Sequence, residues 1–401
     1  MTQNFKKEQP LSTGKLLSIA GLAWLFDAMD VGLLSFINAA LKEDWNLTPE
    51  QVGWIGSVNS LGMAVGAFLF GAMADKVGRK NVFIITLLLF SLASGLSAFS
   101  TTLGFFLALR FLIGAGLGGE LPVASTYVSE SVHPKKRGQT VVLLESFWAL
   151  GWIVAALIAY FIIPEYGWRV ALLITAIPAL YAVVLRLKLP DTMPKQIKKE
   201  KTSMAENIKL VWSKPYIKRT IMLWLLWFSV VFSYYGMFLW LPSVMIMKGF
   251  MMIQSFKYVL IMTLAQLPGY FTAAFFIEKF GRKFVLVTYL IGTAVSAYFF
   301  GNAESFTSLM TAGIFLSFFN LGAWGAMYAY TPEQYPATIR GTGAGMAASF
   351  GRVGGIFGPL MVGYLVAAKV SISMIFTIFA LSIAIGILAV LLLGKETKYT
   401  G

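Results

Sequence analysis

The sequence of 401 residues contains no cysteine and only one histidine. A chain without cysteine cannot form the disulfide framework of a small secreted domain. Because cysteine and histidine are the usual ligands of zinc and haem iron, a zinc or haem site is not expected, and we expect no cofactor. The sequence also lacks the Gly-x4-Gly-Lys-Ser/Thr pattern that cradles nucleotide phosphates, so ATP-driven pumping is not expected.

Charged side chains are scarce as well. They make up 12% of the residues, whereas hydrophobic residues make up 58% and the mean hydropathy is +0.74. A soluble protein of this size has about a quarter of its residues charged, because its whole surface faces water. Most of the surface of this chain must therefore face lipid, and the composition predicts an integral membrane protein.

Twelve apolar stretches follow one another along the chain, each close to the ~20 residues that a helix needs to cross a bilayer. They are continuous rather than alternating, so they predict helices and not the strands of a barrel. The first stretch is too long for the apolar core of a signal peptide, so it is also predicted to be a span. The predicted spans are 16–41, 51–74, 81–100, 104–128, 139–163, 168–187, 219–246, 253–277, 284–300, 305–330, 341–367 and 372–393.

Basic residues are distributed unevenly between the two sides of this arrangement. Of the 32 Lys and Arg residues, 25 lie on the side of the two termini and five lie on the other side. Because basic loops stay in the cytoplasm, both termini are predicted to be cytoplasmic and the protein to lie in the plasma membrane. The net charge of +14 is thus a topology signal, and no nucleic-acid partner is expected. The polar stretch 190–218 is predicted to be a cytoplasmic linker between two six-helix halves, 1–189 and 219–401.

The two halves repeat each other at a shift of 203 residues. Asp75-Lys-Val-Gly-Arg79-Lys matches Glu278-Lys-Phe-Gly-Arg282-Lys, and the pair Glu130 and Arg137 matches Glu333 and Arg340. Because the shift equals an even number of spans, both halves have the same orientation. A parallel repeat about an axis along the membrane normal is typical of secondary transporters with a central site.

Several motifs resemble those of one transporter family. The loop from Gly71 to Lys80, its repeat, and the run Arg110-x3-Gly114-x-Gly116-x-Gly118 resemble the signatures of the major facilitator superfamily, although Ala274 stands where the second loop should carry a glycine. Three further segments resemble proton-coupled metabolite symporters of the synaptic-vesicle-protein-2-like branch, and the whole chain resembles bacterial niacin permeases. These segments are 26–30, 233–236 and 349–355. The resemblance implies an all-α fold with twelve transmembrane helices in two pseudo-symmetric halves.

Charges inside the spans are not repeated between the halves. A charge at the bilayer centre costs at least about 2.5–3.5 kcal/mol, so each needs a partner or a use. Asp27 and Asp30 share a helical face, and two such carboxylates cannot both ionise cheaply, which suits a proton carrier. Arg110 is the expected partner, and the resemblance implies that Asp30 and Arg110 form a proton switch. The alternative is a static salt bridge that orients two helices.

The remaining intramembrane charges are two acids and one base. Glu120 and Glu145 lie at similar depth and can share a proton on the inward path, unless each is satisfied locally. Arg352 lies near the midplane, where the second half offers no acid to neutralise it. An anionic substrate would do so through a guanidinium–carboxylate pair. The alternative is that Arg352 caps helix carbonyls near Gly354 and Gly355.

Aromatic and amide side chains in the second half supply candidates for binding a small ring. The resemblance implies that Tyr234 and Tyr235 face the central cavity, while Trp324 can stack on the ring. Gln266 or Asn320 can reach a ring nitrogen or an amide. The alternative for the aromatic residues is contact with lipid or the membrane interface.

The repeated loop charges are expected to act as gates. Ion pairs and helix N-termini at the cytoplasmic side can hold the inner end closed, although simple anchoring of the topology explains part of their presence. We therefore predict a monomeric proton symporter, not an enzyme, that imports a small aromatic acid, with nicotinate as the first choice and nicotinamide as the second. The alternatives are an exporter of the same fold and a non-transporting receptor. The gating candidates are Asp75, Arg79, Glu130, Arg137, Glu278, Arg282, Glu333 and Arg340.

Overall fold

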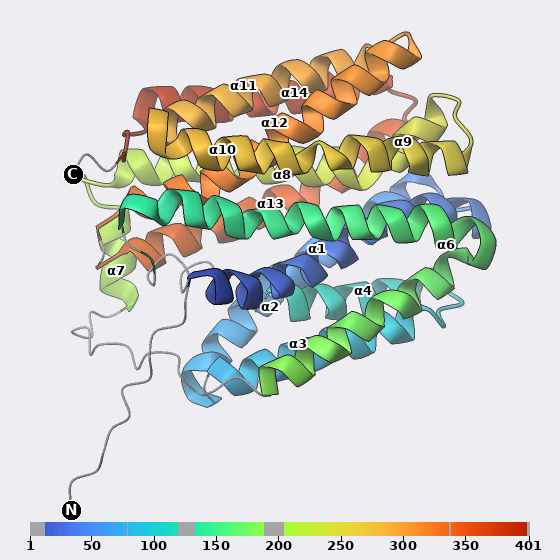
Figure 1. Ribbon diagram of the computed structural model, residues 1–401, viewed down its shortest axis with the longest axis horizontal. Coiled ribbons are helices and arrows are strands. Elements are labelled where there is room, and N and C mark those ends of the chain that lie inside the picture. The colour runs from blue at the N-terminus through green and yellow to red at the C-terminus, as the bar shows by residue number, and fades with distance from the viewer. Residues whose placement is uncertain are drawn as a thin grey trace, which may run out of the picture.

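The computed structural model describes residues 13–77, 79–118, 132, 134–187, 204–336 and 338–398. Every regular element in these ranges is a helix, and the long helices lie side by side along one axis (Figure 1). The first half comprises α1 (Thr13–Asp44), α2 (Pro49–Val77), α3 (Arg79–Ser97), α4 (Leu103–Gly118), the 3-10 turn η1 (Pro134–Lys136) and α6 (Arg137–Leu187). The second half comprises α8 (Ile217–Met247), α9 (Met252–Leu264), α10 (Gln266–Phe280), α11 (Arg282–Gly301), α12 (Phe306–Glu333), α13 (Arg340–Ala367) and α14 (Ile372–Leu393).

Helix length and composition agree with a membrane protein. Among the described residues, nine helical segments are long and apolar enough to cross a bilayer, and α3 and α4 contribute two shorter apolar helices. The longest segment, α6, turns back on itself and crosses twice. The all-α prediction of twelve transmembrane helices is thereby confirmed.

The turn within α6 occurs at Gly167. This residue has φ 83° and ψ 168°, a backbone conformation that glycine adopts at little cost because it has no Cβ. The chain reverses there, as the green ribbon at the edge of Figure 1 shows. The predicted spans 139–163 and 168–187 are therefore two helices that meet at this turn.

The predicted span 253–277 is divided into α9 and α10 at Ala265. Pro268 explains the break, because a proline has no N–H to donate to the carbonyl four residues earlier and its ring collides with that carbonyl. Gln266 begins α10 directly after this break, and its side chain is completely buried.

Small residues let helices of the first half approach closely. A Cβ on Gly114 would collide with the backbone carbonyl of Asn59, and one on Gly118 would collide with that of Met63. Membrane helices associate through such small-residue contacts, since burial in lipid brings no hydrophobic gain. In the glycine run that resembles a family signature, Gly114 and Gly118 thus form the contact surface of α4 for α2, while Gly116 faces Thr86 and Phe90 of α3.

A short helix, α7 (Met204–Val211), lies in the stretch expected to be the linker. It packs onto the second half, where the carbonyl of Val211 accepts a hydrogen bond from Thr220 Oγ1 at 2.7 Å. We call the end of the bundle that holds α7 and Lys398 the terminal end, and the end that holds Gly167 the far end (Figure 1).

The two halves meet along α1, α2 and α6 of the first half and α8, α9, α10, α12 and α13 of the second. Toward the far end, Ser57 Oγ of α2 donates to the carbonyl of Ile356 at 2.5 Å. At the terminal end, the backbone N–H of Gln139 in α6 donates to Glu278 Oε1 of α10 at 3.0 Å. The interface is therefore in contact at both ends.

Candidate functional site

A narrow cavity, too tight to admit a water molecule, lies between the two halves at the centre of the bundle. Its walls are so close together that a ligand would have to part them. Glu145 and Trp148 are three residues apart in α6, and Trp324 and Tyr328 are four residues apart in α12, so each pair lies on one face of its helix. The lining residues are Trp24 of α1, Glu145 and Trp148 of α6, Tyr235 of α8, Trp324 and Tyr328 of α12, and Arg352 of α13.

Glu145 supplies the acid of this cavity. Its side chain is completely buried, and its Oε2 accepts a hydrogen bond from Trp24 Nε1 at 3.0 Å. Trp324 lies next to the same carboxylate, yet Oε1 has no hydrogen-bond partner in the described part of the chain. Its predicted proton-sharing partner, Glu120, lies outside the described residues.

Arg352 supplies the base. Its Nη1 donates to Tyr235 Oη at 3.4 Å and lies 3.7 Å from Met63 Sδ. Within the described residues these side-chain atoms are its hydrogen-bond contacts, and neither is a helix carbonyl as the capping alternative requires. The contact with Tyr235 is longer than the 2.7–3.2 Å of a good N–H···O bond, and a thioether sulfur is a weak acceptor, so most of the guanidinium's donor capacity remains for a ligand.

A second pair of opposite charges lies in the first half. Arg110 Nη1 donates to Asp30 Oδ2 at 3.0 Å, and neither side chain is exposed. Ser94 lies beside Asp30, and the ring of Phe106 lies 5.4 Å from the Arg110 guanidinium carbon. The pair forms this one bond only, since Asp30 Oδ1 and the Nε and Nη2 of Arg110 have no partner among the residues the structure describes.

Asp27 is buried like Asp30, one helical turn before it. Both Asp27 and Arg352 lie within electrostatic range of the Tyr235 hydroxyl. The hydroxyl group of Tyr235 is therefore close to both the acid of α1 and the base of the cavity.

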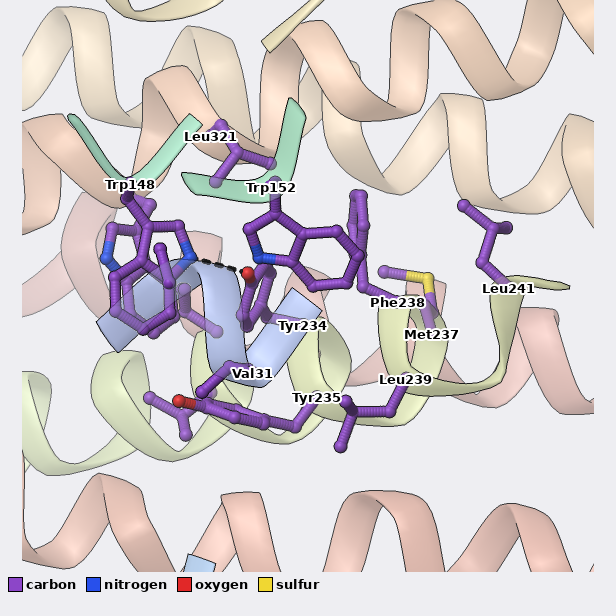
Figure 2. Packing of buried hydrophobic residues seen from close by; sticks show 14 of the residues in the cluster. Val31, Trp148, Trp152, Tyr234, Tyr235, Met237, Phe238, Leu239, Leu241 and Leu321 are labelled. Carbon is purple, nitrogen blue, oxygen red and sulfur yellow. Dashed lines mark hydrogen bonds between the residues drawn. The ribbon is translucent and has the colours of Figure 1, made fainter. Parts of the chain in front are cut away.

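The two adjacent tyrosines have different positions. Tyr235 lines the cavity, whereas Tyr234 is not among the lining residues and accepts a hydrogen bond from Trp148 Nε1 at 2.6 Å. Figure 2 shows Tyr234 pointing toward Trp148 and Trp152 while Tyr235 points away from them. The Tyr234 ring also lies 4.7 Å from that of Trp324, so Tyr234 holds two walls of the cavity in place.

The two predicted amide residues are buried outside the cavity lining. Within the described ranges, the amide oxygen and nitrogen of Gln266 and the amide oxygen of Asn320 have no hydrogen-bond partner. Asn320 shares a face of α12 with Trp324 and Tyr328, because the three are spaced by four residues. Gln266 shares a face of α10 with Tyr270, which lies within electrostatic range of Glu145.

An ion-pair cluster lies at the terminal end. Arg282 Nη1 lies 2.7 Å from Glu278 Oε2, and its Nε lies 3.1 Å from Glu333 Oε2. Because Glu278 also accepts the N–H of Gln139 near the start of α6, the cluster ties one half to the other. Deeper in the bundle, Val142 of α6 lies against Gly325 of α12.

The other gating candidates are less fully described. Arg340 Nε donates to the carbonyl of Tyr335 at 3.4 Å, and Arg137 begins α6 half-buried. The side chains of Asp75 and Arg79, and the whole of Glu130, lie outside the described residues.

Trp24 and Trp148 are cavity residues that the sequence did not single out. A signal was present, because Trp24 precedes Asp27 by three residues and Trp148 follows Glu145 by three. That spacing puts each tryptophan on the same helical face as an intramembrane acid. Their ring contacts support this position, since Trp148 stacks on Trp324 with centroids 6.3 Å apart.

Known proteins resemble this chain over nearly its whole length. The niacin transporter NiaP of Acinetobacter baylyi (strain ATCC 33305 / BD413 / ADP1) is 46% identical over 412 residues, which cover 96% of this chain and 94% of the relative. A protein of Bacillus subtilis (strain 168), named as a candidate niacin/nicotinamide transporter, is 66% identical over 396 residues, 98% of this chain and 99% of the relative.

The fold has a solved counterpart. The xylose transporter XylE from E. coli, in a partially occluded inward-open conformation, superposes with a TM-score of 0.78 at 17% identity, covering 97% of this chain and 99% of that one. The sequence pattern of the Major Facilitator Superfamily matches residues 20–265 and 258–400. The resemblance predicted from the motifs is thus confirmed: the chain belongs to the major facilitator superfamily and is a membrane transporter, not an enzyme.

Proposed function

We propose that this transporter imports niacin together with protons by alternating access, with nicotinate as the main substrate and nicotinamide as a second. The names of its relatives at 46% and 66% identity support the substrate. We further propose that it acts as a monomer in the plasma membrane with both termini in the cytoplasm, because 25 of its 32 basic residues lie on that side.

One observation supports this proposal, namely that Arg352 and aromatic rings line the same narrow cavity between the halves. Nicotinate is a flat ring with one carboxylate. The guanidinium of Arg352 can bind that carboxylate through two parallel hydrogen bonds. Trp324 and Tyr235 offer flat faces for the ring, and both come from the same half as Arg352.

We assign proton coupling to the buried pair of Asp30 and Arg110. Protonation of Asp30 would neutralise the acid and free Arg110, whose Nε and Nη2 already lack a partner in the described structure. A buried charge left unpaired is costly, so proton binding and helix rearrangement are linked. Asp27, Glu120 and Glu145 are the further acids that we assign to the proton path.

The gating role belongs to the terminal end. If this end is cytoplasmic, the cluster of Glu278, Arg282 and Glu333 keeps the inner side closed until the halves separate. We include Asp75, Arg79, Glu130, Arg137 and Arg340 in the same role on the grounds of the internal repeat.

The remaining candidate substrate residues do not line the cavity and act on the substrate indirectly. Tyr234 supports Trp148 and Trp324, and buried Gln266 and Asn320 have amide groups available near the cavity. We propose that they shape the ring pocket or contact an amide substituent such as that of nicotinamide.

Uptake of labelled nicotinate into proteoliposomes, with and without an imposed pH gradient, tests the proposal. We expect accumulation only when the outside is acidic, and a proton influx that rises with added nicotinate. Accumulation without a gradient would contradict proton coupling. No uptake of either pyridine, combined with proton-driven release of other compounds, would favour the exporter.

A further inference from the structure

The central cavity has an acidic part as well as a basic one, and only the basic part is used by the carboxylate of the proposed substrate. Glu145 is completely buried and lines the same cavity as Arg352. Both side chains also lie within electrostatic range of Tyr328. A ligand in this cavity therefore meets both a guanidinium group and a carboxyl group.

One oxygen of Glu145 is fixed and the other is available. Oε2 is held by the indole N–H of Trp24 at 3.0 Å, whereas Oε1 makes no hydrogen bond of good geometry among the described residues, although the Trp324 indole lies close enough to interact with the carboxylate. A polar atom buried without a partner costs free energy, and a ligand atom that pairs with it recovers that cost. The cavity thus presents a hydrogen-bonding atom at a defined position, and Trp24 is the residue that positions it.

The groups around Glu145 limit what can pair with Oε1. Trp24 and Trp324 flank the carboxylate, and Tyr270 and Tyr328 lie within electrostatic range of it. Among the described residues that line the cavity with Glu145, Arg352 is the one with a charged side chain. A small flat ligand can therefore offer Glu145 an atom at its ring edge without displacing another ion pair.

A pyridine nitrogen has the chemistry that this position requires. A protonated Glu145 can donate its hydrogen to the ring nitrogen, and an ionised Glu145 can accept the N–H of a pyridinium. The two descriptions contain the same atoms and differ only in which side of one hydrogen bond holds the proton. A benzene ring offers only carbon and hydrogen at that edge, so it leaves Glu145 buried and unsatisfied.

We propose that Glu145 recognises the ring nitrogen of the substrate, so that the cavity selects heteroaromatic acids over benzene analogues of the same shape. This inference rests on the proposed niacin function and adds a specificity-determining residue to it. Arg352 binds the carboxylate, and Glu145 binds the nitrogen at another position of the ring edge.

The test compares nicotinate with benzoate, which has the same carboxylate and ring size but no nitrogen. Equilibrium binding to the purified full-length protein would be measured for both ligands. A site built to hydrogen-bond a polar atom rejects the analogue that lacks it, so the wild type should bind benzoate roughly 10- to 100-fold more weakly than nicotinate.

Two variants locate the preference. Glu145→Leu should reduce the nicotinate-to-benzoate ratio to about one, because the partner of the nitrogen is gone. Glu145→Gln should keep a reduced preference, since its amide still donates to the nitrogen. Trp24→Phe, which removes the positioning N–H, should lower the ratio in part. Glu165→Gln, an exposed acid beside the far-end turn, is the matched control and should leave the ratio unchanged.

Each outcome decides something. A wild type that binds nicotinate and benzoate equally overturns the inference even if the variants fail to fold, and leaves the niacin proposal standing. A Glu145→Leu protein that keeps the full preference also overturns the inference. Binding of neither nicotinate nor nicotinamide overturns the proposed function and this inference with it.

Discussion

Arg352→Gln should weaken the binding of nicotinate about tenfold more than the binding of nicotinamide. Among the residues that the structure describes, the guanidinium's hydrogen-bond contacts are 3.4 Å to Tyr235 Oη and 3.7 Å to the weak acceptor Met63 Sδ, so a carboxylate would be its main partner. A hydrogen bond to a charged group is worth about 1.5–3 kcal/mol and a neutral one about 0.5–1.5 kcal/mol. The difference, roughly 1–1.5 kcal/mol, corresponds to about a factor of ten in affinity.

Isothermal titration of both ligands into wild-type and variant protein measures this difference directly. Arg352→Lys is the matched control, because it keeps the charge but loses the planar fork, and we expect it to retain part of the preference for the acid. Equal losses for the acid and the amide in Arg352→Gln would refute the reasoning. They would mean that Arg352 shapes the cavity without pairing with the substrate.

Four further changes have defined outcomes. Asp30→Asn should abolish pH-driven accumulation of nicotinate while leaving exchange of labelled for unlabelled substrate, and full accumulation by the variant would exclude Asp30 from coupling. Trp324→Ala should reduce the affinity for nicotinate and nicotinamide alike in titrations, because it acts on the ring, and a selective loss of one would count against stacking. Glu278→Gln should speed the labelling of a cysteine introduced at position 139 (Gln139→Cys), because it weakens the contact between the halves. The sequence has no other cysteine, so labelling reports on this position alone, and an unchanged rate would argue against a gate there. Gly118→Leu should lower the thermal midpoint in detergent by overpacking α2 against α4, at a cost of about 1–3 kcal/mol, and an unchanged midpoint would contradict the close contact.

Most of the fold follows from hydropathy, because lipid leaves helices as the available solution for long apolar stretches. What hydropathy could not resolve is how neighbouring helices are joined or interrupted. The two arms of α6 reverse direction without a longer loop because Gly167 adopts a positive φ, and α9 is separated from α10 because Pro268 interrupts the hydrogen bonding. Both effects are local backbone events that an averaged hydropathy does not detect.

The contacts of the site residues were predictable where the sequence offered few oppositely charged partners. Arg110 is the base in the first-half spans, so charge predicted a contact with the acids of the first span, and the family resemblance singled out Asp30 as its partner. Neighbouring aromatic residues were harder, because consecutive side chains on a helix differ by about 100° in direction. That rotation separates Tyr235, which lines the cavity, from Tyr234, which supports Trp148 behind it. Sequence alone gives the pair but not the phase of the helix relative to the cavity.

The wall of the central cavity is divided between the two halves of the chain. Trp24, Glu145 and Trp148 belong to the first half, and Tyr235, Trp324, Tyr328 and Arg352 belong to the second. A molecule that touches both walls favours the arrangement in which they are close, whereas one that touches a single wall has no preference for it. The length of a ligand therefore decides its effect. A compound that reaches only Arg352 would bind and inhibit the transporter, whereas a compound that contacts both walls would be transported.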